Sequence, residues 1–134
     1  MTGVQTCALP IYARREGSVN AAINGLAPVN VPKRSLRLDA TRSVGEAIEL
    51  RAGLSHEGPR AALPDNSIEL PSWTRIDLGA KWIQSDGSLR MTWRAALDNA
   101  TDRRAWKEAP YQFGHAYLFL LAPRNLRLSL AIEG

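Results

Sequence analysis

Charged side chains alternate with apolar ones along five segments of this 134-residue chain. Several carboxylates on the charged side have an arginine within reach on the same face, so they could form ion pairs. Because each of these carboxylates has such an arginine, we interpret them as structural charge pairs and not as a general acid and base. The expected pairs are Arg75 with Asp98, Asp77 with Arg94, and Asp39 with Arg51.

A second group of chemically capable residues is concentrated in the stretch RRAWKEAPYQFGHAY. Cations and aromatic rings suit an anionic, ring-bearing ligand, since the cations neutralise its charge and the aromatic faces contact its rings. The alternative, which we favour, is that these residues pack the loop against a rim or lie at a lipid interface. The candidates for ligand contact are Arg103, Arg104, Trp106, Tyr111, Phe113 and Tyr117.

Patterns typical of metal sites and enzymes are missing from the sequence. His56 and His115 stand alone, without cysteine or glutamate at ligand spacing, so we expect surface or loop roles for both and no metal site. There is no glycine-rich phosphate loop and no Gly-x-Ser-x-Gly elbow. The arginines behind the net charge of +4 are spread singly, which argues against a nucleic-acid partner. We expect no catalytic residue, no cofactor and no enzymatic activity.

The five alternating segments predict β-strands with one apolar and one polar face. They lie at residues 36–41, 48–55, 74–82, 89–98 and 126–132. Tight connections alternate with long ones, which is typical of an antiparallel up-and-down meander with its short turns at one end. Pro123 lies in or at the start of the last segment, where we expect a β-bulge. The predicted fold class is all-β.

This pattern leaves two architectures open. In a soluble β-sandwich, the apolar faces of two sheets meet in a core, whereas in a transmembrane barrel the apolar face meets lipid and the polar face lines a lumen. The predicted strands are roughly 9–12 residues long, which is enough for a tilted strand to cross a bilayer. Strand length, asymmetric loops and the mixed charges of the polar face favour the barrel. In that arrangement the arginines point inward and Trp93 points outward to lipid.

Turn chemistry predicts the register of the first hairpin. A two-residue turn would place apolar residues opposite charged ones, so an odd-length loop is needed. We expect Val44–Glu46 to form a three-residue loop with Gly45 or Glu46 in a left-handed conformation. This register pairs Asp39 with Arg51 on the polar face.

The second predicted register depends on Asp86-Gly87, a dipeptide typical of type I′ turns. With these two residues at the centre of the turn, Trp82 opposes Met91 and Arg75 opposes Asp98. Every apolar residue then faces another apolar residue, and no like charges are directly opposed.

The first eleven residues, MTGVQTCALPI, have no charge and no periodicity. They resemble the translation of a common sequencing adapter, so we exclude residues 1–11 from the native fold and expect no strand there. The chain's one cysteine, Cys7, lies in this stretch, which leaves residues 12–134 without thiol or disulfide chemistry.

Four segments occur in the order and spacing of one protein family. They are APVNVPKRSLRLDATRS, LPSWTRIDLGAKW, WRAALDNATDRRAW and APRNLRLSLAIEG, within residues 24–134. Together they resemble the C-terminal part of a TonB-dependent outer-membrane receptor of the ferric-siderophore type. The family usually ends in an aromatic residue, whereas this sequence ends in Gly134.

The resemblance implies a partial transmembrane β-barrel, in which residues 12–134 form roughly the last five strands of a 22-stranded barrel. Such a receptor lies in the outer membrane, binds a ferric siderophore at its outer face and imports it with energy supplied through TonB. The implied partners are the ferric siderophore, outer-membrane lipid, and TonB through an N-terminal region outside this sequence. The alternative function is a soluble β-sandwich ligand-binding module, which would stay monomeric in plain buffer.

Overall fold

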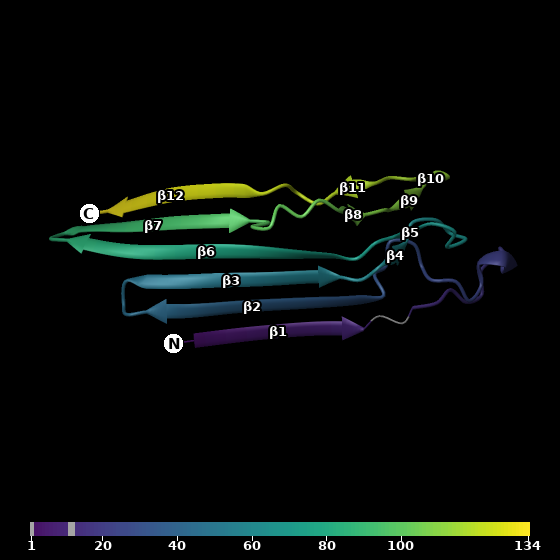
Figure 1. Ribbon diagram of the computed structural model, residues 1–134, viewed down its shortest axis with the longest axis horizontal. Coiled ribbons are helices and arrows are strands. Elements are labelled where there is room, and N and C mark those ends of the chain that lie inside the picture. Colours follow the sequence, from purple (N-terminus) through teal and green to yellow (C-terminus); the bar gives the residue numbers. More distant parts are fainter. Residues whose placement is uncertain (1, 11–12) are drawn as a thin grey trace.

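The computed structural model describes residues 2–10 and 13–134, and its main feature is one six-stranded antiparallel sheet (Figure 1). The strand order is β1-β2-β3-β6-β7-β12, so each long strand pairs with the preceding and following long strands of the chain. The long strands are β1 Thr2–Pro10, β2 Arg34–Val44, β3 Ile48–Glu57, β6 Trp73–Asp86, β7 Leu89–Asp98 and β12 Asn125–Glu133. The predicted all-β meander and its five strands are therefore confirmed.

Short elements fill the long connections at one end of the sheet, and tight turns lie at the other end, as predicted (Figure 1). The described residues contain no helix that is long and apolar enough to cross a membrane. The short elements are the 3-10 helix η1 Ala21–Ile23 and the strands β4 Arg60–Ala61, β5 Glu69–Leu70, β8 Trp106–Glu108, β9 Tyr111–Gln112, β10 His115–Ala116 and β11 Phe119–Leu120.

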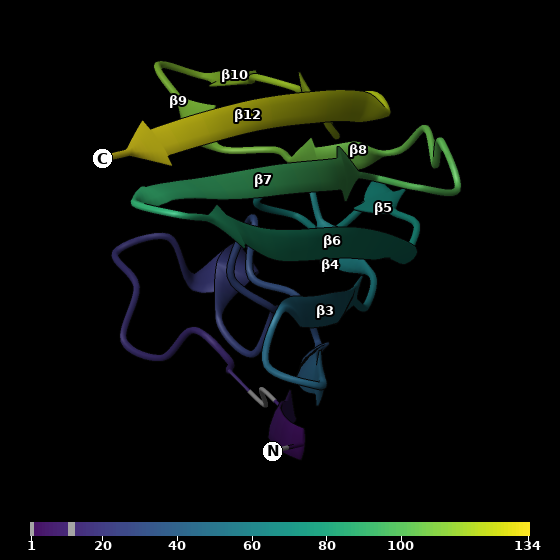
Figure 2. The same cartoon turned by 90° about the vertical axis from the view of Figure 1, so that its left-hand side faces the viewer.

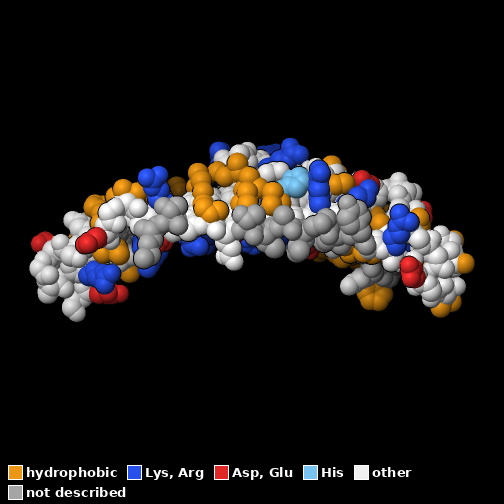
Figure 3. Space-filling model, turned by 90° about the horizontal axis from the view of Figure 1, so that it is seen from below, with side chains coloured by type: hydrophobic (Ala, Val, Ile, Leu, Met, Phe, Trp, Pro, Cys, Tyr) orange, Lys and Arg blue, Asp and Glu red, His pale blue; other side chains and the backbone are white. Residues whose placement is uncertain are grey.

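The sheet twists from β3 to β12 (Figure 2) and curves along its length into an arc, with hydrophobic side chains gathered on the outer side (Figure 3). Apolar residues of neighbouring strands face one another across this outer side, as in Ala52 with Leu78 and Trp82 with Trp93. Trp93 is 43% exposed and Leu128 is 73% exposed. No second layer covers these residues in the part of the chain that the structure describes, so the sheet has no sandwich core.

Most buried residues gather instead where the long connections meet the end of the sheet, a region that we call the loop end. Ala62, Leu70 and Ala109 form the apolar cluster there, and Trp73 and Leu121 are also buried. The buried apolar residues therefore come from the long connections and from strand ends such as Trp73 of β6, while the outer face of the sheet stays exposed.

The first hairpin has the predicted loop length but not the predicted register. Val44 pairs with Ile48, so the loop is 45–47, and Gly45 takes a left-handed φ of 64°. Asp39 consequently faces Gly53 and not Arg51, which makes the predicted pairing wrong by two residues. In the observed register β2 continues to Val44, which forms an apolar pair with Ile48 next to the loop. A shift by two leaves every side chain on its predicted face.

The second hairpin is displaced in the same way. Asp86 pairs with Leu89, so Gly87 and Ser88 form the turn, and Gly87 is left-handed with φ 59°. The prediction that Trp82 opposes Met91 is wrong, because Trp82 faces Trp93 and forms a cross-strand aromatic pair. Met91 faces the polar Gln84 instead, so not every apolar residue faces another one. The same shift of two residues means that Arg75 is not directly opposite Asp98.

Two further predictions about strands are wrong. Residues 2–10, predicted to form no strand, pair with β2 along its length, from Thr2 opposite Arg42 to Pro10 opposite Arg34. The pairing uses backbone hydrogen-bonding groups, and the open edge of β2 offers these groups to any partner strand, regardless of its side chains. Residues 1 and 11 lie outside the described residues, and the adapter origin of this stretch stays a prediction. Pro123 precedes β12, whose pairing with β7 is continuous and has no bulge.

Candidate functional site

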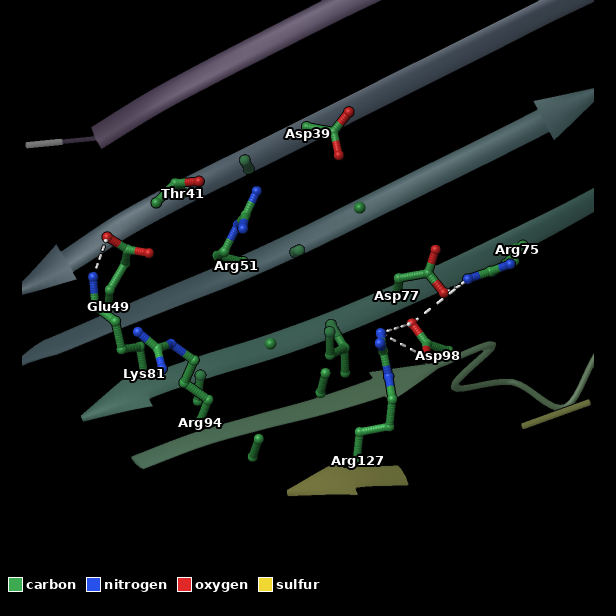
Figure 4. Close-up of a pocket in the computed structure, with 18 of the residues that line it drawn as sticks. Asp39, Thr41, Glu49, Arg51, Arg75, Asp77, Lys81, Arg94, Asp98 and Arg127 are labelled. Carbon is green, nitrogen blue, oxygen red and sulfur yellow. Dashed lines mark hydrogen bonds and ion pairs between the residues drawn. The ribbon is translucent and has the colours of Figure 1, made fainter. Parts of the chain in front are cut away.

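The inner side of the arc carries a charged cavity of about 500 Å³ over β2, β3, β6, β7 and β12 (Figure 4). Six cationic and four acidic side chains line it, which gives the lining a formal charge of +2. All six residues of the predicted charge pairs are among them, on one face as expected. The ten charged residues are Arg37, Asp39, Glu49, Arg51, Arg75, Asp77, Lys81, Arg94, Asp98 and Arg127.

One of the three predicted ion pairs is present. Arg75 lies between two carboxylates, with its Nη2 3.6 Å from Oδ1 of Asp98 and its Nε donating to Oδ1 of Asp77 at 2.7 Å. Asp98 also pairs with Arg127, whose Nη2 lies 3.0 Å from Oδ2. The aspartates of β6 and β7 are thus held at one end of the cavity by two arginines.

The other two predicted pairs do not form, because the strand registers differ by two residues from those expected. Asp39 pairs along its own strand with Arg37, Nε to Oδ2 at 3.1 Å. Lys81 faces Arg94 across the β6–β7 ladder, contrary to the expectation that no like charges are opposed. On its other side Lys81 contacts Glu49, Nζ to Oε2 at 3.1 Å, which offsets part of that repulsion.

Arg51 and Arg94 consequently face the cavity with no carboxylate of the described residues within ion-pair distance. Guanidinium groups donate several hydrogen bonds in one plane and suit carboxylate or other oxyanion groups. The arrangement therefore fits electrostatic contact with an anionic surface. Among the described residues no group of histidine, cysteine and acidic side chains could hold a metal ion.

The six candidates for ligand contact lie in the connection between β7 and β12, which extends past the end of the sheet (Figure 1). Trp106 is in β8 and Tyr111 in β9, and they are 38% and 37% exposed. Phe113, at the tip of the β9–β10 hairpin, is 90% exposed and has a left-handed φ of 51°. Arg103, Arg104 and Tyr117 lie outside the named strands of this connection. The structure thus spreads the six along the loop, and their role in ligand contact stays a prediction.

Sequence reasoning missed the asparagines that hold the loop end together. Asn99 is fully buried, donates from Nδ2 to the carbonyls of Arg103 and Ala122, and accepts at Oδ1 from the Arg103 N–H. Asn30 accepts at Oδ1 from the Ala109 N–H at 2.7 Å and joins connections far apart in the chain. Both have left-handed backbones, which asparagine tolerates better than most residues. Both asparagines lie in the segments that resemble the receptor family, and this position was the one indication in the sequence that they matter.

A comparison of the sequence with protein-family models finds no match. The ferrichrome receptor FcuA of Yersinia enterocolitica is 29% identical over 90 residues, which make up 67% of this chain and 12% of that receptor. The chain therefore spans about an eighth of the curated relative that it matches.

Two solved structures from Acinetobacter baumannii share the fold. The ferric preacinetobactin receptor BauA matches with a TM-score of 0.75 and 24% identity, over 87% of this chain and 17% of the receptor. The siderophore receptor PiuA matches with a TM-score of 0.71 and 18% identity, over 98% of this chain and 19% of the receptor. The predicted resemblance to siderophore receptors is confirmed. The six-stranded sheet corresponds in fold to a segment of such a receptor.

Proposed function

We propose that this chain is part of the barrel wall of a TonB-dependent outer-membrane receptor that binds and imports a ferric siderophore. The observation that carries the proposal is the division of the curved sheet into an exposed apolar outer face and a charged inner face. A barrel wall in a bilayer requires this division, because lipid covers one face and a polar interior meets the other.

In this arrangement the tight turns face the periplasm and the long connections face outward, as is general for barrels of this class. The charged cavity lines the interior, where Arg51 and Arg94 meet acidic or polar groups of the rest of the receptor. The loop between β7 and β12 lies at the outer surface, where its aromatic and cationic residues either line the rim or contact the iron chelate. The activity is binding and transport driven through TonB, without catalysis.

The reading frame upstream of Tyr12 in genomic DNA tests the proposal. We expect it to continue through further alternating strands, a plug domain and a signal peptide. Deleting the whole frame should lower uptake of radioactive iron from one siderophore by at least tenfold, and a plasmid copy should restore it. A frame that closes just upstream of Tyr12, or unchanged uptake from every siderophore tested, contradicts the proposal.

The solution behaviour of the chain separates the receptor from the soluble sandwich. The exposed apolar face should make the 134-residue chain depend on detergent and aggregate when detergent is removed. A monomer that unfolds cooperatively in plain buffer would instead favour the sandwich.

A further inference from the structure

Between the two ends of β2, one charged residue interrupts the apolar face of the strand. Arg42 lies between Ala40 and Val44 on that face and is opposite Leu50 of β3. Its side chain is exposed, and no carboxylate of the described residues lies within ion-pair distance. A cation on the lipid-facing side of a barrel is unfavourable unless its charged end reaches a polar partner. Arg42 therefore needs a partner from outside the chain.

An apolar groove of about 530 Å³ crosses β6, β7 and β12 on the same outer face. Its floor is the small cross-strand pair Ala80 and Ala95, and one wall is the larger pair Trp82 and Trp93. Leu128 of β12 extends the lining. The groove exists because a row of small side chains lies next to a row of large ones.

The strand registers place Arg42 and the groove in one row across the sheet. Arg42 faces Leu50, which faces Ala80, which faces Ala95, which faces Leu128. Arg42 is two strands from Ala80, or about 10 Å at the usual strand spacing. A ligand with an anionic head and an apolar tail would span this row with its head at one end and its tail in the groove.

We propose that this row binds one anionic glycerophospholipid, with its phosphate on the guanidinium of Arg42 and one acyl chain in the groove. The inference rests on the proposed function, which puts this face in lipid and the turn end of the sheet at the inner leaflet. The cation selects an anionic head, and the almost entirely apolar groove selects a hydrocarbon chain. The cross-strand tryptophans suit the adjoining interface, since indole rings concentrate at headgroup level.

The test uses the full chain refolded from urea into vesicles of equal parts phosphatidylcholine and phosphatidylglycerol. Bromine on the acyl chains of one lipid at a time quenches nearby tryptophan fluorescence. We expect brominated phosphatidylglycerol to quench at least twice as strongly as brominated phosphatidylcholine. The double variant W82F/W93F should lose this preference, which assigns the signal to the groove.

Arg42→Gln should make the two lipids quench equally, while Arg42→Lys should keep part of the preference. Arg37→Gln is the matched control, because Arg37 is an exposed arginine of the same strand that lines the inner cavity. A preference that survives Arg42→Gln, or equal quenching in the unaltered chain, overturns the lipid site and leaves the proposed function standing. Absence of quenching by both lipids places the apolar face outside the bilayer and overturns both.

Discussion

The sheet and the loop end of this molecule are stabilised in different ways. In the sheet, backbone ladders connect strands whose apolar side chains stay exposed, as with Leu128 at 73%. At the loop end the backbone is irregular and side chains are buried, as with Ala109 and Asn99 at 0%. The sheet therefore depends on what surrounds it, whereas the loop end depends on hydrogen bonds from a few particular side chains.

The two regions also differ in which property of the sequence determines their structure. In the sheet, the alternation of apolar and polar side chains determines it, so exchanging one residue for another of similar polarity leaves the strand in place. At the loop end it is the individual residue, because Asn99 satisfies three backbone groups that no apolar residue could satisfy. Substitutions in the two regions should consequently differ in size and in their dependence on the solvent.

The largest effect is expected from Asn99→Ala. The change removes three hydrogen bonds worth about 1 kcal/mol each and adds about 1 kcal/mol of left-handed backbone strain, so we expect a loss of about 3–4 kcal/mol. Urea unfolding in detergent micelles measures the loss. Asn99→Gly is the control, because it loses the same hydrogen bonds but accepts the φ of 51°. A loss below about 1 kcal/mol for Asn99→Ala would show that the loop end does not depend on this side chain.

The next effect compares one substitution on the two faces of the sheet. Leu78→Arg puts a cation on the outer face and should cost about 2–4 kcal/mol near the middle of a bilayer. Gly53→Arg puts the same cation on the inner face between Asp39 and Asp77, where we expect a change below about 1 kcal/mol. Unfolding of both variants in lipid vesicles measures the difference. Equal losses would mean that lipid does not cover the outer face.

A smaller effect is expected at the tight turns. Gly87 has φ 59° and open space where an alanine methyl group would lie, so Gly87→Ala should cost about 1 kcal/mol through backbone strain alone. Gly79→Ala, at an ordinary φ with Arg51 Cβ 3.6 Å from the new methyl position, should be neutral or slightly stabilising. The urea midpoints of unfolding of the two variants test this prediction. An equal change of the midpoint in both variants would show that backbone strain at the turn is not the cause.

The smallest effect concerns Asp65 in the loop between β4 and β5. A hydrogen bond from the Ser67 backbone N–H, and then one from its hydroxyl, hold the pKa of the Asp65 carboxyl below its usual value of 3.8. Because the folded-state pKa is lowered, this stabilisation is present above 3.8 and is lost as the pH falls through the folded value. An NMR titration should show the lowered pKa, and Ser67→Ala should raise it part of the way back. A pKa that does not move in Ser67→Ala would exclude the hydroxyl as a cause.

The alternation of apolar and charged residues is enough to predict the strands and their faces, because side chains alternate with a period of two. It is not enough to predict which residues oppose each other. The Asp86-Gly87 dipeptide predicts a turn that the structure places at Gly87 and Ser88, and a shift of two preserves every face. For that reason Arg75 still contacts Asp98 on the shared face, whereas Asp39 does not meet Arg51.

The loop end could not be predicted in the same way, because its connections have no period. Asn30 and Ala109 meet although they are 79 residues apart, and nothing local to either residue indicates the contact. The place of Arg42 on the apolar face was also missed, since the predicted strand ends at Thr41 while β2 continues to Val44. Strand β1 forms against expectation because its pairing depends on the open edge of β2 and not on an alternating pattern of its own.

The strictly sequential strand order of the sheet affects how a barrel wall of the proposed kind can fold and how its gene can evolve. Each long strand touches its predecessor and its successor, so the free energy of the sheet is close to a sum of nearest-neighbour contributions, as in a repeat protein. A folded hairpin offers its edge strand for pairing with the next hairpin of the chain, so no segment that is distant in sequence has to pair first. By the same logic, a gene could gain or lose one hairpin and change the circumference of the wall while leaving the remaining pairings untouched.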